Sequence, residues 1–191
     1  KFALESASSA ALAQEDKPPT YVLAWTTTPW TLPGNVALAV GKDIEYIKVE
    51  KDGALYILAK DVAEKVVAGG RVVGEFKGSD LVGKKYKPVF DYFAKDETLK
   101  NRENGWQIYP ADFVKTEEGT GVVHIAPAFG DDDMQLGKKC NLPFVQHVTR
   151  DGKFVPEVTD FAGRAVKPKD TALQRKIDEE ILEYLKGHGT Y

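Results

Sequence analysis

The run of residues 25–35 constrains the fold of this 191-residue chain more than any other stretch. Pro29 and Pro33 lack amide hydrogens, so neither can continue the hydrogen-bond ladder of a sheet, and a strand that enters this run must end in it. Residues 21–27 have the β-branched and aromatic content of a strand. The sequence therefore predicts a strand over residues 21–27 that opens into a loop at the prolines.

Threonines gather where this strand is expected to end. Thr26, Thr27 and Thr28 are consecutive, and Thr31 follows directly after Trp30. Threonine carries a hydroxyl on a stiff β-branched side chain, so such a cluster can fix hydrogen-bond donors and acceptors around a small polar substrate. The alternative is a threonine-rich strand with a proline turn and no chemistry, which composition by itself favours.

Composition is that of an ordinary globular domain. Hydrophobic residues make up 42% of the chain and charged residues 29%, and the length fits one domain over residues 1–191. No apolar window approaches the roughly 20 residues that span a bilayer. The single cysteine, Cys140, excludes an internal disulfide and a cysteine-based zinc cluster. We expect a cytoplasmic protein without membrane contact.

The charge balance limits the partners of the chain. A net charge of -3 argues against a general nucleic-acid-binding surface, which is usually basic. Basic clusters at residues 84–87 and 138–139 could each meet a few phosphates of a nucleic acid, although such clusters are more often merely solvated. Because the chain starts within an apolar pattern and without an initiator Met, we expect a domain excised from a larger protein.

The rest of the chain predicts short strands and a few helices. Residues 45–50 and 54–59 flank a turn at residues 51–53, which is typical of a hairpin. The implied fold is a β-rich α+β, barrel-like domain with a few peripheral helices. Further strands are expected at residues 36–40, 71–76, 87–90, 106–114, 121–125, 144–148 and 161–166, and helices at 61–68, 131–140 and 171–185.

A second run, at residues 118–133, reads EGTGVVHIAPAFGDDD. Together with the TTTPWTLP of residues 26–33, it resembles the two signature segments of the editing domain inserted in isoleucyl-tRNA synthetases, a family of class I aminoacyl-tRNA synthetases. The resemblance covers nearly the whole chain. The related valyl and leucyl enzymes carry an Arg-Pro-containing segment at the first position and lack the histidine of the second, so the resemblance favours the isoleucyl family.

This resemblance implies an activity and partners. It implies hydrolytic proofreading in which valine is removed from misacylated tRNA(Ile) after its transfer. The expected partners are the 3′ end of tRNA(Ile) carrying a misloaded amino acid and the rest of the synthetase. ATP binding is expected only of the full-length enzyme, and no cofactor is expected in this domain.

His124 has two interpretations. A lone histidine in an apolar strand, directly flanked by Val123 and Ile125, is more often a hydrogen-bonded core residue than a ligand. The family resemblance makes it a site residue, because the editing site of the family contains a histidine at the corresponding place. His147 and His188 have no such support, and we expect both to be structural or exposed.

Three consecutive acids begin the helix expected at residues 131–140. Asp131, Asp132 and Asp133 point in different directions on one helical turn, so a metal site is not expected, and one of them is expected to cap the helix. The resemblance places the substrate-binding aspartate of the family at Asp133. There it would accept the α-ammonium group of the misloaded amino acid in a charge-assisted hydrogen bond.

Hydrolysis of an activated ester needs a positioned water and stabilisation of an oxyanion more than a strong nucleophile. Two walls of a pocket that admits valine and excludes isoleucine are expected from Thr31 and His124, and a third from Trp25. The predicted catalytic residues are Thr27, Thr28, His124 and Asp133, and the predicted substrate-binding residues are Trp25, Thr26, Thr31, Asn35 and Asp133, with no metal ligand.

Two other functions remain open at this point. The chain could belong to a valyl enzyme that edits threonine on tRNA(Val). It could also be a noncatalytic β-barrel module that binds nucleic-acid ends or protein partners, in which case the threonines and aspartates would be turn and cap residues.

Overall fold

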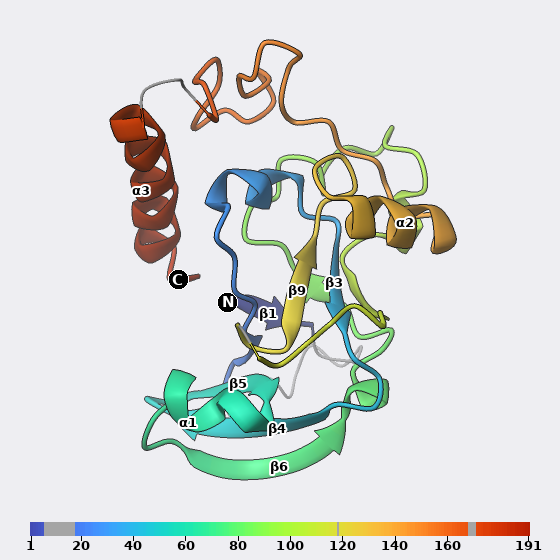
Figure 1. The fold of residues 1–191 in the computed structure, drawn as a ribbon, viewed down its shortest axis with the longest axis vertical. Helices are drawn as coiled ribbons and strands as arrows, with labels where there is room; N and C mark the ends of the chain where they lie inside the picture. The colour runs from blue at the N-terminus through green and yellow to red at the C-terminus, as the bar shows by residue number, and fades with distance from the viewer. Residues whose placement is uncertain (6–17, 118, 168–170) are drawn as a thin grey trace, which may run out of the picture. The chain divides into compact units, whose positions relative to one another are not determined.

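A computed structural model describes residues 1–5, 18–117, 119–167 and 171–191, except the side chains of residues 171–175 (Figure 1). The chain divides into two compact units. The first comprises residues 1–25, 38–87 and 107–123, and the second comprises residues 26–37, 88–106 and 124–191. No helix within the described ranges is both long enough and apolar enough to cross a membrane.

A six-stranded sheet forms most of the first unit. Its strand order is β6-β4-β5-β2-β1-β7, with every neighbouring pair antiparallel except β2 and β5, which are parallel. Among the described residues the sheet ends at β6 and β7 without closing, so it is open rather than a barrel. Its strands are β1 (Phe2–Leu4), β2 (Thr20–Val22), β4 (Glu45–Lys51), β5 (Ala54–Ala59), β6 (Arg71–Lys77) and β7 (Tyr86–Lys87).

The predicted hairpin is confirmed as β4 and β5. Asp52 and Gly53 between the two strands have φ angles of 49° and 75°, and two consecutive positive φ values suit the twist of a tight hairpin. One face of the hairpin is packed against a short helical segment made of η2 (Lys60–Val62) and α1 (Ala63–Val66). That segment replaces the longer helix predicted at residues 61–68.

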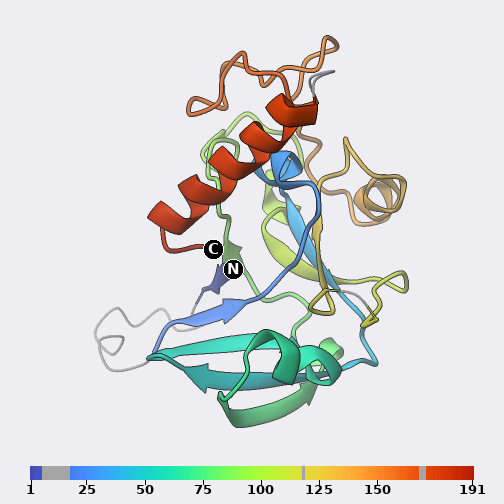
Figure 2. The same ribbon diagram turned by 60° about the vertical axis from the view of Figure 1, so that its left-hand side comes forward.

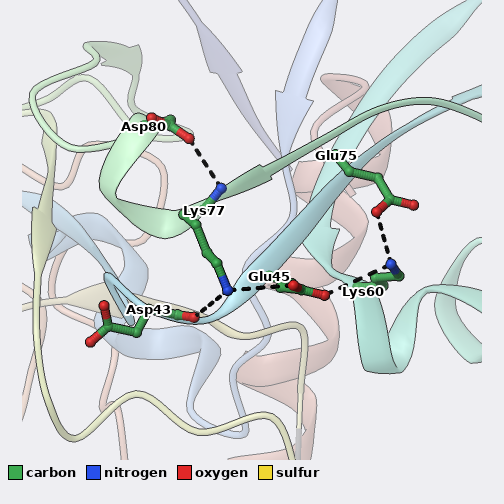
Figure 3. Close-up of polar contacts among 6 residues, drawn as sticks. All are labelled: Asp43, Glu45, Lys60, Glu75, Lys77 and Asp80. Carbon is green, nitrogen blue, oxygen red and sulfur yellow. Dashed lines mark hydrogen bonds and ion pairs between the residues drawn. The ribbon is translucent and has the colours of Figure 1, made fainter.

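Charged side chains cover the edge of this sheet (Figure 3). Lys60 Nζ lies 2.8 Å from Glu75 Oε2 and 3.8 Å from Glu45 Oε2, and Lys77 Nζ lies 3.4 Å from Glu45 Oε1. The backbone N–H of Lys77 donates to Asp80 in η3 (Gly78–Asp80). These exposed pairs contribute little to stability, but charges along edge strand β6 disfavour pairing with other chains.

A second sheet has three strands in the order β8-β3-β9. These are β8 (Gln107–Pro110), β3 (Ala37–Val40) and β9 (Val122–Ile125), which confirm the strands predicted at residues 36–40 and 121–125. All four residues of β3 are completely buried. Such a continuous apolar run is typical of a strand covered on both faces.

Helical segments dominate the second unit. They are η1 (Pro29–Gly34), η4 (Arg102–Asn104), α2 (Asp131–Lys139) and α3 (Thr171–Gly187), so the helices predicted from residues 131 and 171 are confirmed. α3 (red) lies beside η1 (blue) in both views (Figures 1 and 2). It buries Ile177, Ile181 and Leu185, and this packing supports the loop that carries the threonines.

Several predicted strands are shorter than expected or absent. β2 ends at Val22 and not at residue 27. The next residue, Leu23, still donates its N–H to Ile57 O, but its own carbonyl oxygen accepts the hydroxyl of Thr120 at 2.5 Å. The hydrogen-bond ladder of the sheet therefore stops there. The strands predicted at 87–90 and 106–114 are reduced to β7 and β8. Those predicted at 144–148 and 161–166 are irregular and make only isolated bridges.

Candidate functional site

The threonine run folds into a turn followed by η1. Thr28 precedes the first residue of η1, Pro29, whose missing N–H costs nothing at a helix start. Thr26 Oγ1 accepts the N–H of Thr28 at 3.0 Å, and the hydroxyls of these two threonines lie 3.3 Å apart. Thr27 between them is exposed. Side-chain hydrogen bonds of Thr26 therefore shape the turn that presents the hydroxyls of Thr27 and Thr28.

Thr31 connects η1 to strand β9. Its N–H and its hydroxyl both donate to Thr28 O, at 3.0 and 2.8 Å. The same hydroxyl oxygen lies 2.9 Å from His124 Nε2 in β9. The structure thus brings Thr28 and Thr31 together with His124, which lies 93 residues beyond Thr31 in the sequence.

His124 is a buried and uncharged residue. Only 8% of its surface is exposed. Burial, and to a lesser extent the nearby His147, lowers the pKa of His124 to about 4. The imidazole is therefore neutral at pH 7, so it can exchange hydrogen bonds with a ligand but does not offer it a positive charge.

Asp133 differs from its two neighbours at the start of α2. Asp131 and Asp132 are exposed, whereas Asp133 is half-buried and its Oδ2 accepts the N–H of Ala126 at 2.8 Å. Burial raises the pKa of Asp133, although the Ala126 hydrogen bond opposes this. A partly desolvated carboxylate gains more from a nearby cation than an exposed one.

The expected aspartate cap of α2 is wrong. Gly130 occupies the cap position, and no side chain caps the helix there. A Cβ at Gly130 would lie 3.1 Å from the Oδ1 and Cγ atoms of Asp133. The glycine therefore leaves room for the carboxylate to turn back over the start of α2 toward Ala126.

Asn35 and Trp25 are placed differently from the other candidates. Asn35 is buried, and its side-chain Nδ2 donates to Ala37 O at 2.8 Å, which fixes the chain between η1 and β3. Trp25 belongs to the first unit, where it is 52% exposed, and a Cβ at Gly119 would lie 3.3 Å from its ring. All the other predicted site residues belong to the second unit.

Sequence reasoning did not identify how closely His147 is associated with η1. Its ring is completely buried, and its Nε2 lies 2.9 Å from Trp30 O. The Phe129 ring packs on it at 4.5 Å between centroids, and burial lowers the pKa of His147 to about 4. His147 is thus structural, as expected, but it supports the threonine loop. His188 is exposed.

The described part of the chain contains no group of three or more histidine, cysteine, aspartate or glutamate side chains that could hold a metal ion. The candidate site therefore consists of hydroxyls, a neutral imidazole and a carboxylate. Neutral donors and acceptors next to one partly buried negative charge suit a ligand that is polar and carries one positive charge.

Comparison with known proteins gives close relatives in sequence. No protein-family model matches the chain. An isoleucine–tRNA ligase of Clostridium novyi is 47% identical over 171 residues, covering 89% of this chain and 15% of that protein. The corresponding ligases of Clostridium acetobutylicum and Treponema denticola are 45% and 44% identical, each over 89% of this chain. The chain spans about 15% of the length of these relatives.

Solved structures give the fold. A structure named GlLeuRS-CP1 superposes with a TM-score of 0.69 at 15% identity, covering 93% of this chain and 84% of that one. An editing domain of the Plasmodium falciparum cytosolic leucyl-tRNA synthetase gives 0.52 at 14% identity, covering 89% and 68%. The architecture of mixed sheets with few helices is thus that of synthetase editing domains.

Proposed function

Because this chain belongs with the editing domains of the isoleucine–tRNA ligase family, we propose that it hydrolyses the ester that joins a wrong amino acid, valine, to tRNA(Ile). The sequence relatives support the family, and the threonine–histidine–aspartate arrangement supports the chemistry. The 3′ end of tRNA(Ile) and the remainder of a synthetase are the proposed partners. A cytoplasmic location is part of the proposal, since a single cysteine fits a reducing compartment.

One observation carries the proposal. Asp133 is held by the Ala126 amide just beyond the end of β9, two residues after His124, and His124 is hydrogen-bonded to the threonine loop. The Asp133 carboxylate and the threonine loop are thereby both hydrogen-bonded to residues 124–126. An amino acid esterified to tRNA presents an α-ammonium group and an ester carbonyl but no free carboxylate, and this is the pattern that such a site complements.

Asp133 is proposed to bind the α-ammonium group. Its pKa is raised by burial, so an adjacent ammonium would restore the favourable environment that the ionised carboxylate loses on leaving water. Asp131 and Asp132 are exposed. Among the three acids, only Asp133 therefore combines partial burial with a fixed orientation.

The hydroxyls of Thr27 and Thr28 are proposed to act at the ester carbonyl. The amides of Thr28, Thr31 and Ala126 already donate within the protein, and Pro29 has none, which leaves the hydroxyls of Thr27 and Thr28, together with backbone amides that are not so engaged, as the proposed donors for an oxyanion. They would orient the ester and stabilise the charge that develops on its carbonyl oxygen.

Hydrolysis then needs no covalent enzyme intermediate. The oxygen of a water molecule bonds to the carbonyl carbon, the bond between that carbon and the ribose oxygen breaks, and the proton that the water gives up ends on the ribose oxygen. The neutral His124 is too weak a base at pH 7 to remove the proton of water fully, because its pKa is about 4. It acts through hydrogen bonding and bulk.

The need for such a second site follows from side-chain size. Valine lacks one methylene of isoleucine, and one methylene in an apolar pocket is too little to discriminate on, a limit for which isoleucyl enzymes are the standard illustration. A second pocket that takes valine but is closed to isoleucine corrects the errors. Thr31 and His124, which are both buried and bonded to each other, are the proposed walls.

Incubation of the chain with three aminoacylated tRNAs tests the proposal. We expect release of valine from valyl-tRNA(Ile) above the rate of spontaneous hydrolysis, and no acceleration with isoleucyl-tRNA(Ile). Faster release of threonine from threonyl-tRNA(Val) would assign the chain to a valyl enzyme instead. Binding of tRNA without acceleration for any of the three would leave a noncatalytic module.

A further inference from the structure

The turn that follows strand β9 is attached to helix α2 at two points. In this turn the Phe129 N–H donates to Ala126 O at 2.9 Å, and the ring of Pro127 presets the φ angle at the second position. Asp133 of α2 accepts the Ala126 N–H at 2.8 Å. A Cβ at Gly137 of α2 would lie only 3.0 Å from Pro127 Cγ, so the helix backbone passes close to the proline. We therefore treat the turn and the Asp133 carboxylate as one rigid piece.

One side chain of this turn reaches helix η1. The half-buried Phe129 ring packs edge-on against the Trp30 ring, at 5.3 Å between centroids and with 81° between the ring planes. Phe129 also packs on the His147 ring at 4.5 Å, and His147 Nε2 lies 2.9 Å from Trp30 O. Trp30, two residues after Thr28, is thus held both by its ring and by its main chain.

The threonine loop and the piece that carries Asp133 are consequently joined at two places. The first is the hydrogen bond between His124 Nε2 and Thr31 Oγ1, and the second is the contact between Phe129 and Trp30. Two bodies that share one contact can rotate about it, whereas a second contact fixes their orientation. Edge-to-face aromatic pairs prefer a defined geometry, so the Phe129 ring supplies the constraint that the hydrogen bond lacks.

We propose that Phe129 is a positioning residue that fixes the separation between the Asp133 carboxylate and the hydroxyls of Thr27 and Thr28. This role rests on the proposed function, in which the carboxylate binds the α-ammonium group and the hydroxyls act at the ester carbonyl. The ammonium nitrogen and the carbonyl carbon are both bonded to the α-carbon, so their separation in the substrate is fixed. A site that binds both groups has to match it, and a misplacement of about 1 Å can cost about a hundredfold in rate.

Two leucine variants separate this positioning from packing. Phe129→Leu keeps an apolar side chain in the turn but removes the ring edge that meets Trp30. Phe154→Leu is the matched control, because the buried Phe154 also packs on His147, at 6.0 Å between centroids. Each variant removes one ring from the same aromatic cluster, and Phe129→Leu alone removes the ring that joins the turn to η1. Phe129→Met takes the place of Phe129→Leu if thermal unfolding shows that the leucine variant does not fold.

Crystal structures of the parental chain and of both variants measure the separation directly. We expect the distance between Asp133 Cγ and Thr28 Oγ1 to change in Phe129→Leu by more than about 0.5 Å, the tolerance within which catalytic groups have to be held. In Phe154→Leu the distance should stay within that tolerance, and η1 and α2 should be formed in both variants. An unchanged distance in Phe129→Leu would overturn the proposal without reference to any activity.

Single-turnover hydrolysis of two esters tests what the separation is for. Valyl-tRNA(Ile) presents the ammonium group, whereas the tRNA(Ile) ester of the corresponding α-hydroxy acid presents a neutral hydroxyl in its place and is not held by charge. With saturating protein we expect Phe129→Leu to slow release of valine by about tenfold or more, and release of the hydroxy acid by less than about threefold, because an ester without the anchor can shift toward the threonine hydroxyls. Phe154→Leu should change both rates by the same factor.

The outcomes distinguish the role of Phe129 from the function itself. An equal loss for both esters in Phe129→Leu would show that the ring only supports the fold, and would overturn the proposal, as would an unchanged rate of valine release. Absence of acceleration by the parental chain for either ester would instead refute the proposed hydrolytic function. The distance measured in the crystals would then still decide whether Phe129 sets the position of Asp133 relative to the threonines.

Discussion

Gly34→Ala should destabilise the protein strongly, although it adds a single methyl group. A Cβ at Gly34 would lie 2.2 Å from His147 Nδ1 and 2.5 Å from its Cε1, far inside van der Waals contact. The ring has no room to withdraw, because it is completely buried, packs on Phe129 at 4.5 Å between centroids, and bonds Trp30 O through Nε2. Either η1 or His147 has to move.

The size of the effect follows from these two contacts. Overpacking a core by a methyl group typically costs about 1–3 kcal/mol. Displacing His147 also breaks its bond to Trp30 O, which leaves a buried carbonyl unsatisfied at a cost of about 1–3 kcal/mol more. For a chain of this length each kcal/mol lowers Tm by about 2–4 °C, so we expect a fall of roughly 5–20 °C.

Thermal unfolding measures this, with Gly187→Ala as the matched control. A Cβ at Gly187, the last residue of α3, meets no atom within 4 Å, and alanine in a helix is favoured by up to about 1 kcal/mol. Its Tm should be unchanged or slightly raised. In a His147→Ala background, Gly34→Ala should cost little. If the loss in Tm is the same with and without the His147 ring, the collision is not its cause.

Three further predictions concern the site and its pH dependence. Asp133→Asn should slow release of valine by one to two decades, since loss of a charge-assisted contact costs about 1.5–3 kcal/mol, whereas Asp131→Asn should change it little; equal rates in single-turnover deacylation would exclude Asp133 as the ammonium-binding residue. His124→Ala should hydrolyse isoleucyl-tRNA(Ile) as well as valyl-tRNA(Ile), because the bulk of the His124 ring is proposed to exclude the isoleucine side chain. A variant that no longer releases valine and still does not release isoleucine would show instead that His124 acts in the reaction. The free energy of unfolding should fall as pH drops from about 6.5 to about 4, by roughly 1.4 kcal/mol per pH unit for each of His124 and His147. Both have a pKa near 4 in the folded chain, so the unfolded chain binds the protons first. Urea denaturation across this pH range measures the effect, and a flat profile would contradict buried neutral rings.

Short-range sequence patterns predicted those elements of the fold that depend mainly on residues close together in the chain. The β4–β5 hairpin follows from alternation on both sides of Asp52 and Gly53, whose positive φ angles the turn requires. In residues 144–148, Val145 is buried between exposed Phe144 and Gln146, but His147 and Val148 are both buried. The sequence predicted a strand here, but a strand also needs a neighbouring strand, and apart from one bridge at Val148 these residues have none among the described residues. Pairing of this kind depends on distant residues that a local pattern does not contain.

The same limit applies to the site. The two motifs identified His124 and Asp133 through a family resemblance, and the structure adds what each of them bonds: Thr31 for the first and the Ala126 amide for the second. His147 shows why burial and charge state alone would not have found the site. It is as buried as His124 and has a pKa lowered to the same value.

The two histidines differ in what their Nε2 atoms bond. His147 bonds the main chain at Trp30 O, so its hydrogen bond stabilises the position of η1 whatever side chains η1 carries. His124 bonds a side-chain hydroxyl, and that hydroxyl could in principle donate or accept. Because His147 is bonded to the main chain of η1, whereas His124 joins the threonine loop to β9 through a side chain, we assign support of the loop to His147 and a place in the candidate site to His124.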